Sequence, residues 1–68
     1  MVTVKYSNSK NKDVKLIEQL DDYTAERLFL KLSGGSVNPA VLNEGDYTLE
    51  NIEVNKDNVI YDSVVFIP

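Results

Sequence analysis

The chain has 68 residues and a formal net charge of −4 at pH 7; 43% of its residues are hydrophobic and 26% are charged. This length allows one small domain, residues 1–68, and this balance of apolar and charged residues excludes a disordered chain. Cysteine and histidine are both absent, so disulfides and thiolate metal sites are excluded, and the small core depends on packing or self-association.

The first predicted element is a strand that starts at Val2. Val2, Val4 and Tyr6 alternate with polar residues, which is the pattern of a strand with one buried face. Residues 7–12 contain only Ser, Asn and Lys, and Ser and Asn side chains bond to the nearby backbone in competition with a β-ladder. This segment is predicted to be a solvated turn.

The second element, in residues 14–20, fits two patterns. Val14 and Leu16 share one face of a strand, whereas Val14, Ile17 and Leu20 share one face of a short helix. We favour the strand, which would pair with the first strand as a hairpin.

A helix is predicted next. The apolar residues that recur at helical spacing are Ala25, Leu28, Phe29 and Leu32. Asp21 or Asp22 supplies an N-cap, and Gly34 can take the left-handed conformation that ends a helix. Lys31 lies in the last turn, where a positive charge suits the helix dipole.

Residues 40–42 are predicted to form a short edge strand. They lie between a loop that ends near Pro39 and a tight turn at residues 43–46.

A longer strand is predicted at residues 47–54. Its apolar phase changes between Leu49 and Ile52. This change predicts a β-bulge near Glu50 and Asn51, or a break into two pieces.

The last predicted strand follows a turn at residues 55–58 and is apolar on both faces. Strict alternation places Ile60, Val64 and Phe66 on one face, and Val59, Tyr61, Val65 and Ile67 on the other. One helix covers only one face of a sheet. We therefore expect Tyr61, Val65 and Ile67 to form the interface of a homo-oligomer, most simply a dimer. The alternatives are that the sheet curls and residues 36–42 fold over this face, or that the sheet closes into a small barrel.

These elements predict an α+β fold, in which an antiparallel sheet of four to five strands carries one helix on one face in ββαββ order. With "VTVKYSN" at the start and "NVIYDSVVFIP" at the end, this order resembles small ββαββ proteins encoded by phages and mobile elements of Gram-positive bacteria. The resemblance implies an accessory protein, often oligomeric, that binds host or phage macromolecules or small ligands. It carries over no individual site residue.

Catalysis is not expected from this sequence. Histidine and cysteine are absent, and no G-x-S-x-G motif or phosphate-binding loop occurs. The pairs Asp21-Asp22 and Glu44-x-Asp46 lack the spacing of a calcium loop and are better explained as a helix cap and a turn. We expect no cofactor and no metal.

The charge distribution bears on partners and location. Residues 1–15 carry a net charge of +3 and the remaining residues −7, so no basic surface for nucleic acid is expected. The first residues lack the pattern of a signal peptide, and no run of about 20 apolar residues occurs. We expect a cytoplasmic protein, in the host cytoplasm if it is phage-encoded, with no membrane partner.

Six acidic residues fall in the last two strands and their turns: Glu44, Asp46, Glu50, Glu53, Asp57 and Asp62. Carboxylates on a sheet face can imitate a nucleic-acid backbone and bind the basic groove of a host enzyme. We therefore take Glu50, Glu53, Asp57 and Tyr47 as candidate partner-binding residues of an inhibitor. The alternative is that these charges only keep the protein soluble.

Arg27 and Lys31 are the candidate ligand-binding residues, since a lone arginine can bind a phosphate or carboxylate. In this alternative function a nucleotide-type ligand sits between subunits near Tyr47 or Tyr61. The remaining alternatives are solvated helix charges and a purely structural oligomer.

Overall fold

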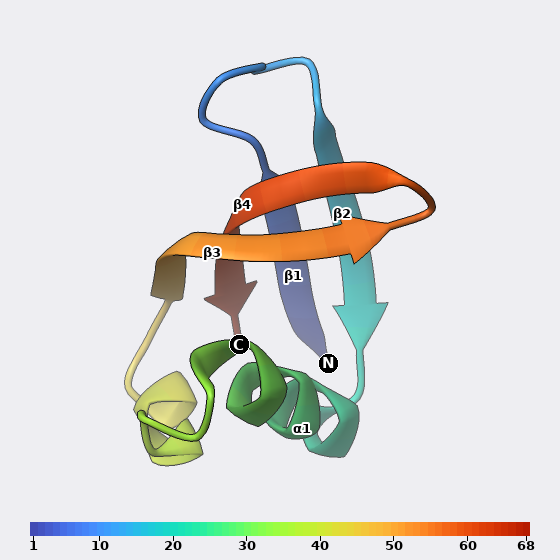
Figure 1. Cartoon of the computed structure of the whole chain (residues 1–68). Helices are drawn as coiled ribbons and strands as arrows, with labels where there is room; N and C mark the ends of the chain where they lie inside the picture. Colours follow the sequence, from blue (N-terminus) through green and yellow to red (C-terminus); the bar gives the residue numbers. More distant parts are fainter.

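The computed structural model describes all 68 residues. The elements, in chain order, are β1 (Val2–Ser7), β2 (Lys15–Leu20), α1 (Asp22–Ser33), the 3₁₀-helix η1 (Pro39–Asn43), β3 (Tyr47–Lys56) and β4 (Val59–Ile67). The strands form one antiparallel sheet in the order β2-β1-β4-β3, and α1 lies at the end of the sheet where the chain termini are found (Figure 1). The predicted α+β class and ββαββ order are confirmed.

β1 is a central strand, and its inward face carries Val2, Val4 and Tyr6, which are all buried. β2 is confirmed as a strand because it pairs with β1 over its whole length. The turn between them is stabilised locally, since the Asn8 side chain accepts hydrogen bonds from the backbone N–H groups of Lys10 (2.9 Å) and residue 11 (3.2 Å).

α1 begins and ends at the caps that the sequence predicts. The Asp21 carboxylate accepts a hydrogen bond of 2.8 Å from the backbone N–H of Thr24. At the other end Gly34 is left-handed, with φ of 68°, and the N–H of Gly35 donates to the carbonyl of Leu30 at 3.0 Å.

The predicted strand at residues 40–42 is wrong, because these residues belong to η1. The Asn38 side chain accepts a hydrogen bond from the N–H of Ala40 (2.9 Å), and Pro39 occupies the first helical position, where its missing N–H costs nothing. The sheet therefore has four strands. Leu42 of η1 is buried in the core.

β3 contains the predicted β-bulge. Its pairing with β4 shifts register between Glu50 and Val54, so that three residues of β3 lie opposite Asp62 alone. Asn51, in this stretch, has a positive φ of 56°. The bulge keeps the apolar residues on both sides of it on the inner face of the sheet.

In β4 the alternation of inward and outward side chains also shifts by one residue, opposite the bulge of β3. Tyr61, Val64 and Phe66 are all buried on the inner face, although strict alternation separates Tyr61 from the other two. The prediction that Tyr61 shares a face with Val65 and Ile67 is wrong, because the bend of the hairpin at the bulge turns Tyr61 inward. Val65 and Ile67 stay half-buried on the outer face.

Beyond the bend, the β3–β4 hairpin crosses in front of β1 and β2, and the sheet takes the form of a cup (Figure 1). The core inside the cup consists of Val2, Val4, Tyr6, Ala25, Phe29, Leu42, Leu49, Tyr61, Val64 and Phe66. Phe29 of α1 meets Tyr47 and Phe66 edge to face, with ring centroids 5.4 and 5.2 Å apart. The sheet curls, as one alternative held, but it encloses the inner face only.

Candidate functional site

Three polar side chains join the tip of the β3–β4 hairpin to β2. The Tyr6 hydroxyl donates to Glu18 Oε1 at 2.7 Å, and Lys56 Nζ donates to Glu18 Oε2 at 2.8 Å. The Lys56 ammonium also lies 4.9 Å from the centroid of the Tyr6 ring, a cation–π contact. This cluster closes one side of the cup with side chains, because β2 and β3 are opposite edges of the sheet and share no ladder.

The contacts of the cluster shift the pKa values of its two acids. Hydrogen bonds from Lys56 and from Tyr6 lower the pKa of Glu18. Burial, with a further effect of the hydrogen bond to Glu18, raises the pKa of the Tyr6 phenol far above its ordinary value. Neither acid changes its protonation near neutral pH, so the cluster acts as a fixed contact between strands.

Asp62 lies at the bend of β4 and joins it to the β1–β2 loop. The N–H of Ser9 donates to Asp62 Oδ1 at 2.9 Å, and the Ser9 hydroxyl donates to Asp62 Oδ2. These hydrogen bonds lower the pKa of Asp62. Beside them, Asn8 Nδ2 donates to the carbonyl of Ile60 at 3.0 Å. Asp62 thus has a structural partner within the chain.

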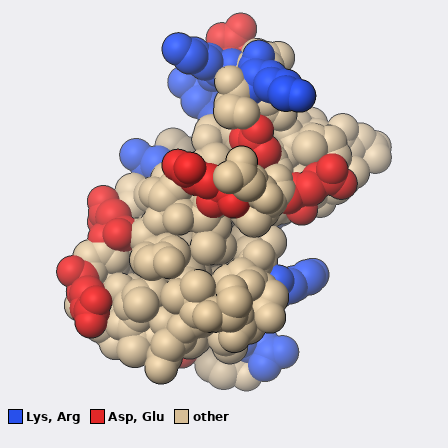
Figure 2. Space-filling model, turned by 60° about the vertical axis from the view of Figure 1, so that its left-hand side comes forward, with Lys and Arg blue, Asp and Glu red and all other residues tan.

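The three predicted partner-binding acids are all exposed, but they do not form one row. Glu50 lies opposite Ser63, just before the bulge, whereas Glu53 lies beyond the bulge and Asp57 lies in the turn at the hairpin tip. None of the three takes part in an ion pair. Figure 2 shows acidic groups separated by uncharged surface, and basic groups gathered at the upper end, where the β1–β2 loop lies in Figure 1.

Tyr47 is half-buried and does not belong with these acids. Its ring and the Phe29 ring pack edge to face, so this predicted partner-binding residue contributes mainly to the core.

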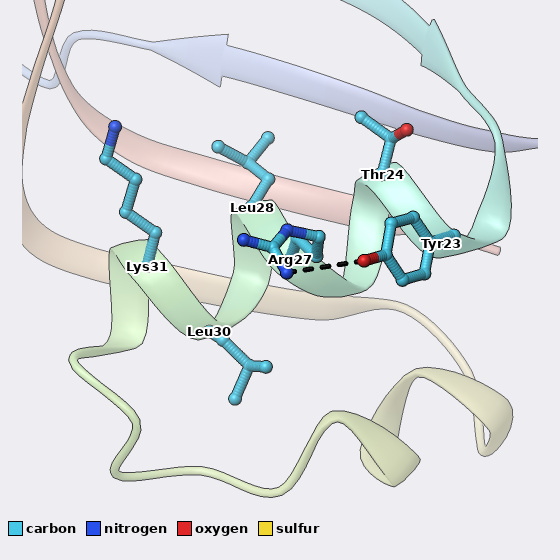
Figure 3. Close-up of a pocket in the computed structure, with 6 residues that line it drawn as sticks. All are labelled: Tyr23, Thr24, Arg27, Leu28, Leu30 and Lys31. Carbon is cyan, nitrogen blue, oxygen red and sulfur yellow. Dashed lines mark hydrogen bonds between the residues drawn. The ribbon is translucent and has the colours of Figure 1, made fainter.

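The predicted ligand-binding residues Arg27 and Lys31 lie on an open face of α1 (Figure 3). Arg27 Nη1 donates to the Tyr23 hydroxyl at 3.3 Å, and the guanidinium carbon lies 5.7 Å from the centroid of the Tyr23 ring. In Figure 3 Arg27 lies back toward Tyr23, whereas Lys31 extends toward the strands. The two cations do not converge on one point, and every residue that lines this depression comes from α1.

The outer face of the sheet carries the two remaining predicted interface residues, Val65 and Ile67. The structure adds a third apolar side chain to them, because Ile17 of β2 is 59% exposed on the same face. Lys5 stands between Ile17 and Val65 in the cross-strand pairing. The sequence does hold a signal for Ile17, since a strand with Leu16 inward must place Ile17 outward.

Together, these features define a small α+β domain in which a cupped, four-stranded antiparallel sheet holds one helix and presents separate charged and apolar surfaces. No helix has the length and apolar character needed to cross a bilayer, and no three acidic side chains are grouped so as to hold a metal ion. No protein-family model, curated protein or solved structure matches the chain.

Proposed function

We propose that this protein is a non-enzymatic binding protein that attaches, through the outer side of its β3–β4 hairpin, to a positively charged surface of a macromolecule. The observation that carries the proposal is the separation of charge across the hairpin. Glu53 and Asp57 are exposed and have no cation partner. Lys56, the only cation of the hairpin, points inward and is bound to Glu18.

This separation gives the outer side of the hairpin a negative charge that no ion pair neutralises. Such a surface speeds the encounter with a basic partner, and its effect weakens as salt screens the charges. A basic groove that binds nucleic-acid phosphates is a suitable target, and occupying it would make the protein an inhibitor. The resemblance to accessory proteins of phages and mobile elements supports a host macromolecule as the partner.

Partner capture with matched charge variants tests this proposal. The immobilised chain, its Glu53→Lys variant and its Glu26→Lys variant are exposed in parallel to a lysate of a Gram-positive bacterium, and bound proteins are identified by mass spectrometry. Glu26 is an exposed acid of α1, so its variant makes the same change of charge away from the hairpin. We expect wild type and Glu26→Lys to capture the same basic protein.

Binding of that protein to Glu53→Lys should be about fivefold weaker, because an attraction is replaced by a repulsion. Titration at increasing salt should reduce the difference between the variants. Equal retention by Glu53→Lys and wild type contradicts the proposal, and so does the failure of the wild-type chain to capture any protein.

A further inference from the structure

The outer face of the sheet is a separate surface with its own pattern of charge. Its central row runs across the four strands through Ile17, Lys5, Val65 and Thr48, which are joined pairwise by the strand register. α1, η1 and the curled part of the hairpin all pack toward the inner face, so no element of the chain covers this row. Ile17 is 59% exposed there.

Opposite charges lie at the two ends of the neighbouring row. That row runs through Lys15, Ser7, Ser63 and Glu50, with the lysine on β2 and the glutamate on β3, the two edges of the sheet. Neither charged residue is in an ion pair. The face is thus positive at one edge and negative at the other. Between the edges lie Ser7 and Ser63 in this row, and Lys5 and Val65 in the central row.

We propose that a second copy of this chain docks on this face, sheet against sheet, about a two-fold axis that runs parallel to the strands between β1 and β4. This rotation places β2 of each copy over β3 of the other. Lys15 of one copy then faces Glu50 of the other, and symmetry makes the contact twice. Ile17, Val65 and Ile67 become covered in a layer of the usual thickness between stacked sheets, about 10 Å.

The charges select this orientation and this occupant. A two-fold axis across the strands would place each strand over its own copy, with Lys5 directly over Lys5, whereas the axis along the strands places each Lys5 over Val65 of the other copy. A partner of one sign, such as an anionic lipid surface, would match Lys15 and be repelled by Glu50. A second copy satisfies both edges at once, because each edge of the face complements the other.

The dimer goes beyond the proposed binding function. It leaves free the outer side of the β3–β4 hairpin, which is the surface that the binding function uses. Glu53 and Asp57 lie past the bend, on the hairpin that crosses in front of β1 and β2, whereas the proposed interface is on the opposite side of the molecule, behind β1 and β2 (Figure 1). Charge reversal at Glu53 therefore leaves the dimer intact, and charge reversal at Lys15 leaves the hairpin surface intact. Each proposal can fail without the other.

Analytical ultracentrifugation of wild type and charge-swap variants tests the dimer. Over a range from low micromolar to near millimolar concentration, wild type should pass from monomer to dimer. The single variants Lys15→Glu and Glu50→Lys should each raise the dissociation constant about tenfold or more, because each loses two contacts and gains two repulsions. The double variant Lys15→Glu with Glu50→Lys restores opposite charges and should return to within about threefold of wild type.

Two further variants serve as controls. Lys12→Glu changes the same charge in the exposed β1–β2 loop and should leave the dissociation constant unchanged. Ile17→Asp should abolish the dimer while the monomer keeps its circular dichroism spectrum, because this side chain is largely exposed in the monomer. A wild-type chain that stays monomeric at the highest concentration overturns the proposal, as does a double variant no better than the single ones.

Discussion

Tyr6 belongs to the core and to the polar cluster at the same time. Only 1% of the surface of Tyr6 is exposed, yet its hydroxyl donates a hydrogen bond of 2.7 Å to the partly exposed Glu18 carboxylate. Tyr61 lies beside it, with ring centroids 5.5 Å apart, and makes no hydrogen bond through its hydroxyl to another residue. The hydroxyls of the two tyrosines thus differ in the hydrogen bond to Glu18, and the Tyr6 ring has in addition the contact with Lys56.

We expect Tyr6→Phe to lower the free energy of unfolding by about 1 to 2 kcal/mol, because Glu18 loses one of its two hydrogen-bond donors. Tyr61→Phe, the matched control, should change it by less than about 0.5 kcal/mol. Urea unfolding monitored by circular dichroism measures both. Equal losses for the two variants would show that the hydroxyl of Tyr6 does not stabilise the fold through Glu18.

At the scale of the element, the bulge in β3 decides where the hairpin bends. Asn51 adopts φ of 56° within the stretch where the register shifts. Asn tolerates this left-handed conformation better than most residues, and a β-branched residue does not. Asn at position 51 therefore suits the left-handed backbone conformation found where the hairpin bends.

Asn51→Val is expected to lower the free energy of unfolding by about 1 to 2 kcal/mol, the cost of a left-handed conformation for an ordinary residue. Asn51→Gly should leave it within about 0.5 kcal/mol of wild type. Glu53→Val places the same side chain on the exposed side of the strand and should not share the loss. Denaturant titrations of the three variants test this, and an unaffected Asn51→Val would mean that the bulge is not held by this conformation.

The elements that the sequence predicts correctly are those with strong local signals. The helix has a regular apolar stripe with caps at Asp21 and Gly34, and the bulge is visible as a shift of phase between Leu49 and Ile52. The error at residues 40–42 comes from reading a short apolar run as a strand, when the preceding Asn-Pro pair starts a helical turn.

The surfaces were less predictable because they depend on contacts between distant residues. Glu18 and Lys56 are 38 positions apart and meet only because the hairpin curls over β2. Strict alternation predicts that Tyr61 shares a face with Val65 and Ile67, because no local signal in β4 indicates the change of phase opposite the bulge. Glu53 and Asp57, in contrast, are exposed as polar residues in a strand and a turn usually are.

At the scale of the whole molecule, three carboxylates link stability to pH. Hydrogen bonds from Lys56 to Glu18, from Thr24 to Asp21 and from Ser9 to Asp62 are the main causes that lower their pKa values in the folded state. The folded state therefore binds these protons less tightly than the unfolded chain. Their stabilising effect is complete above the ordinary carboxyl pKa of about 4 and is lost as the pH falls below it.

The temperature of half-unfolding should accordingly stay nearly constant from about pH 7 to pH 5 and fall steeply below about pH 4. Glu18→Gln should be less stable at neutral pH and should lose less on acidification. Glu26→Gln, an exposed position with no hydrogen bond from its side chain, should keep the wild-type profile. Thermal melts of the three proteins from pH 7 to below pH 4 test these expectations. If the temperature of half-unfolding falls with pH in parallel for Glu18→Gln and wild type, the role given to Glu18 is contradicted.

The sheet order β2-β1-β4-β3 has a consequence for how the protein is made. β4 is the last strand to be synthesised, yet it lies between β1 and β3, which pair with nothing else on those sides. A nascent chain that ends before Val59 can form the first hairpin and α1, but β3 has no ladder to join and the core lacks Val64 and Phe66. Folding must therefore wait for residues 59–67, and until they emerge the apolar side of β1 is open to chaperones.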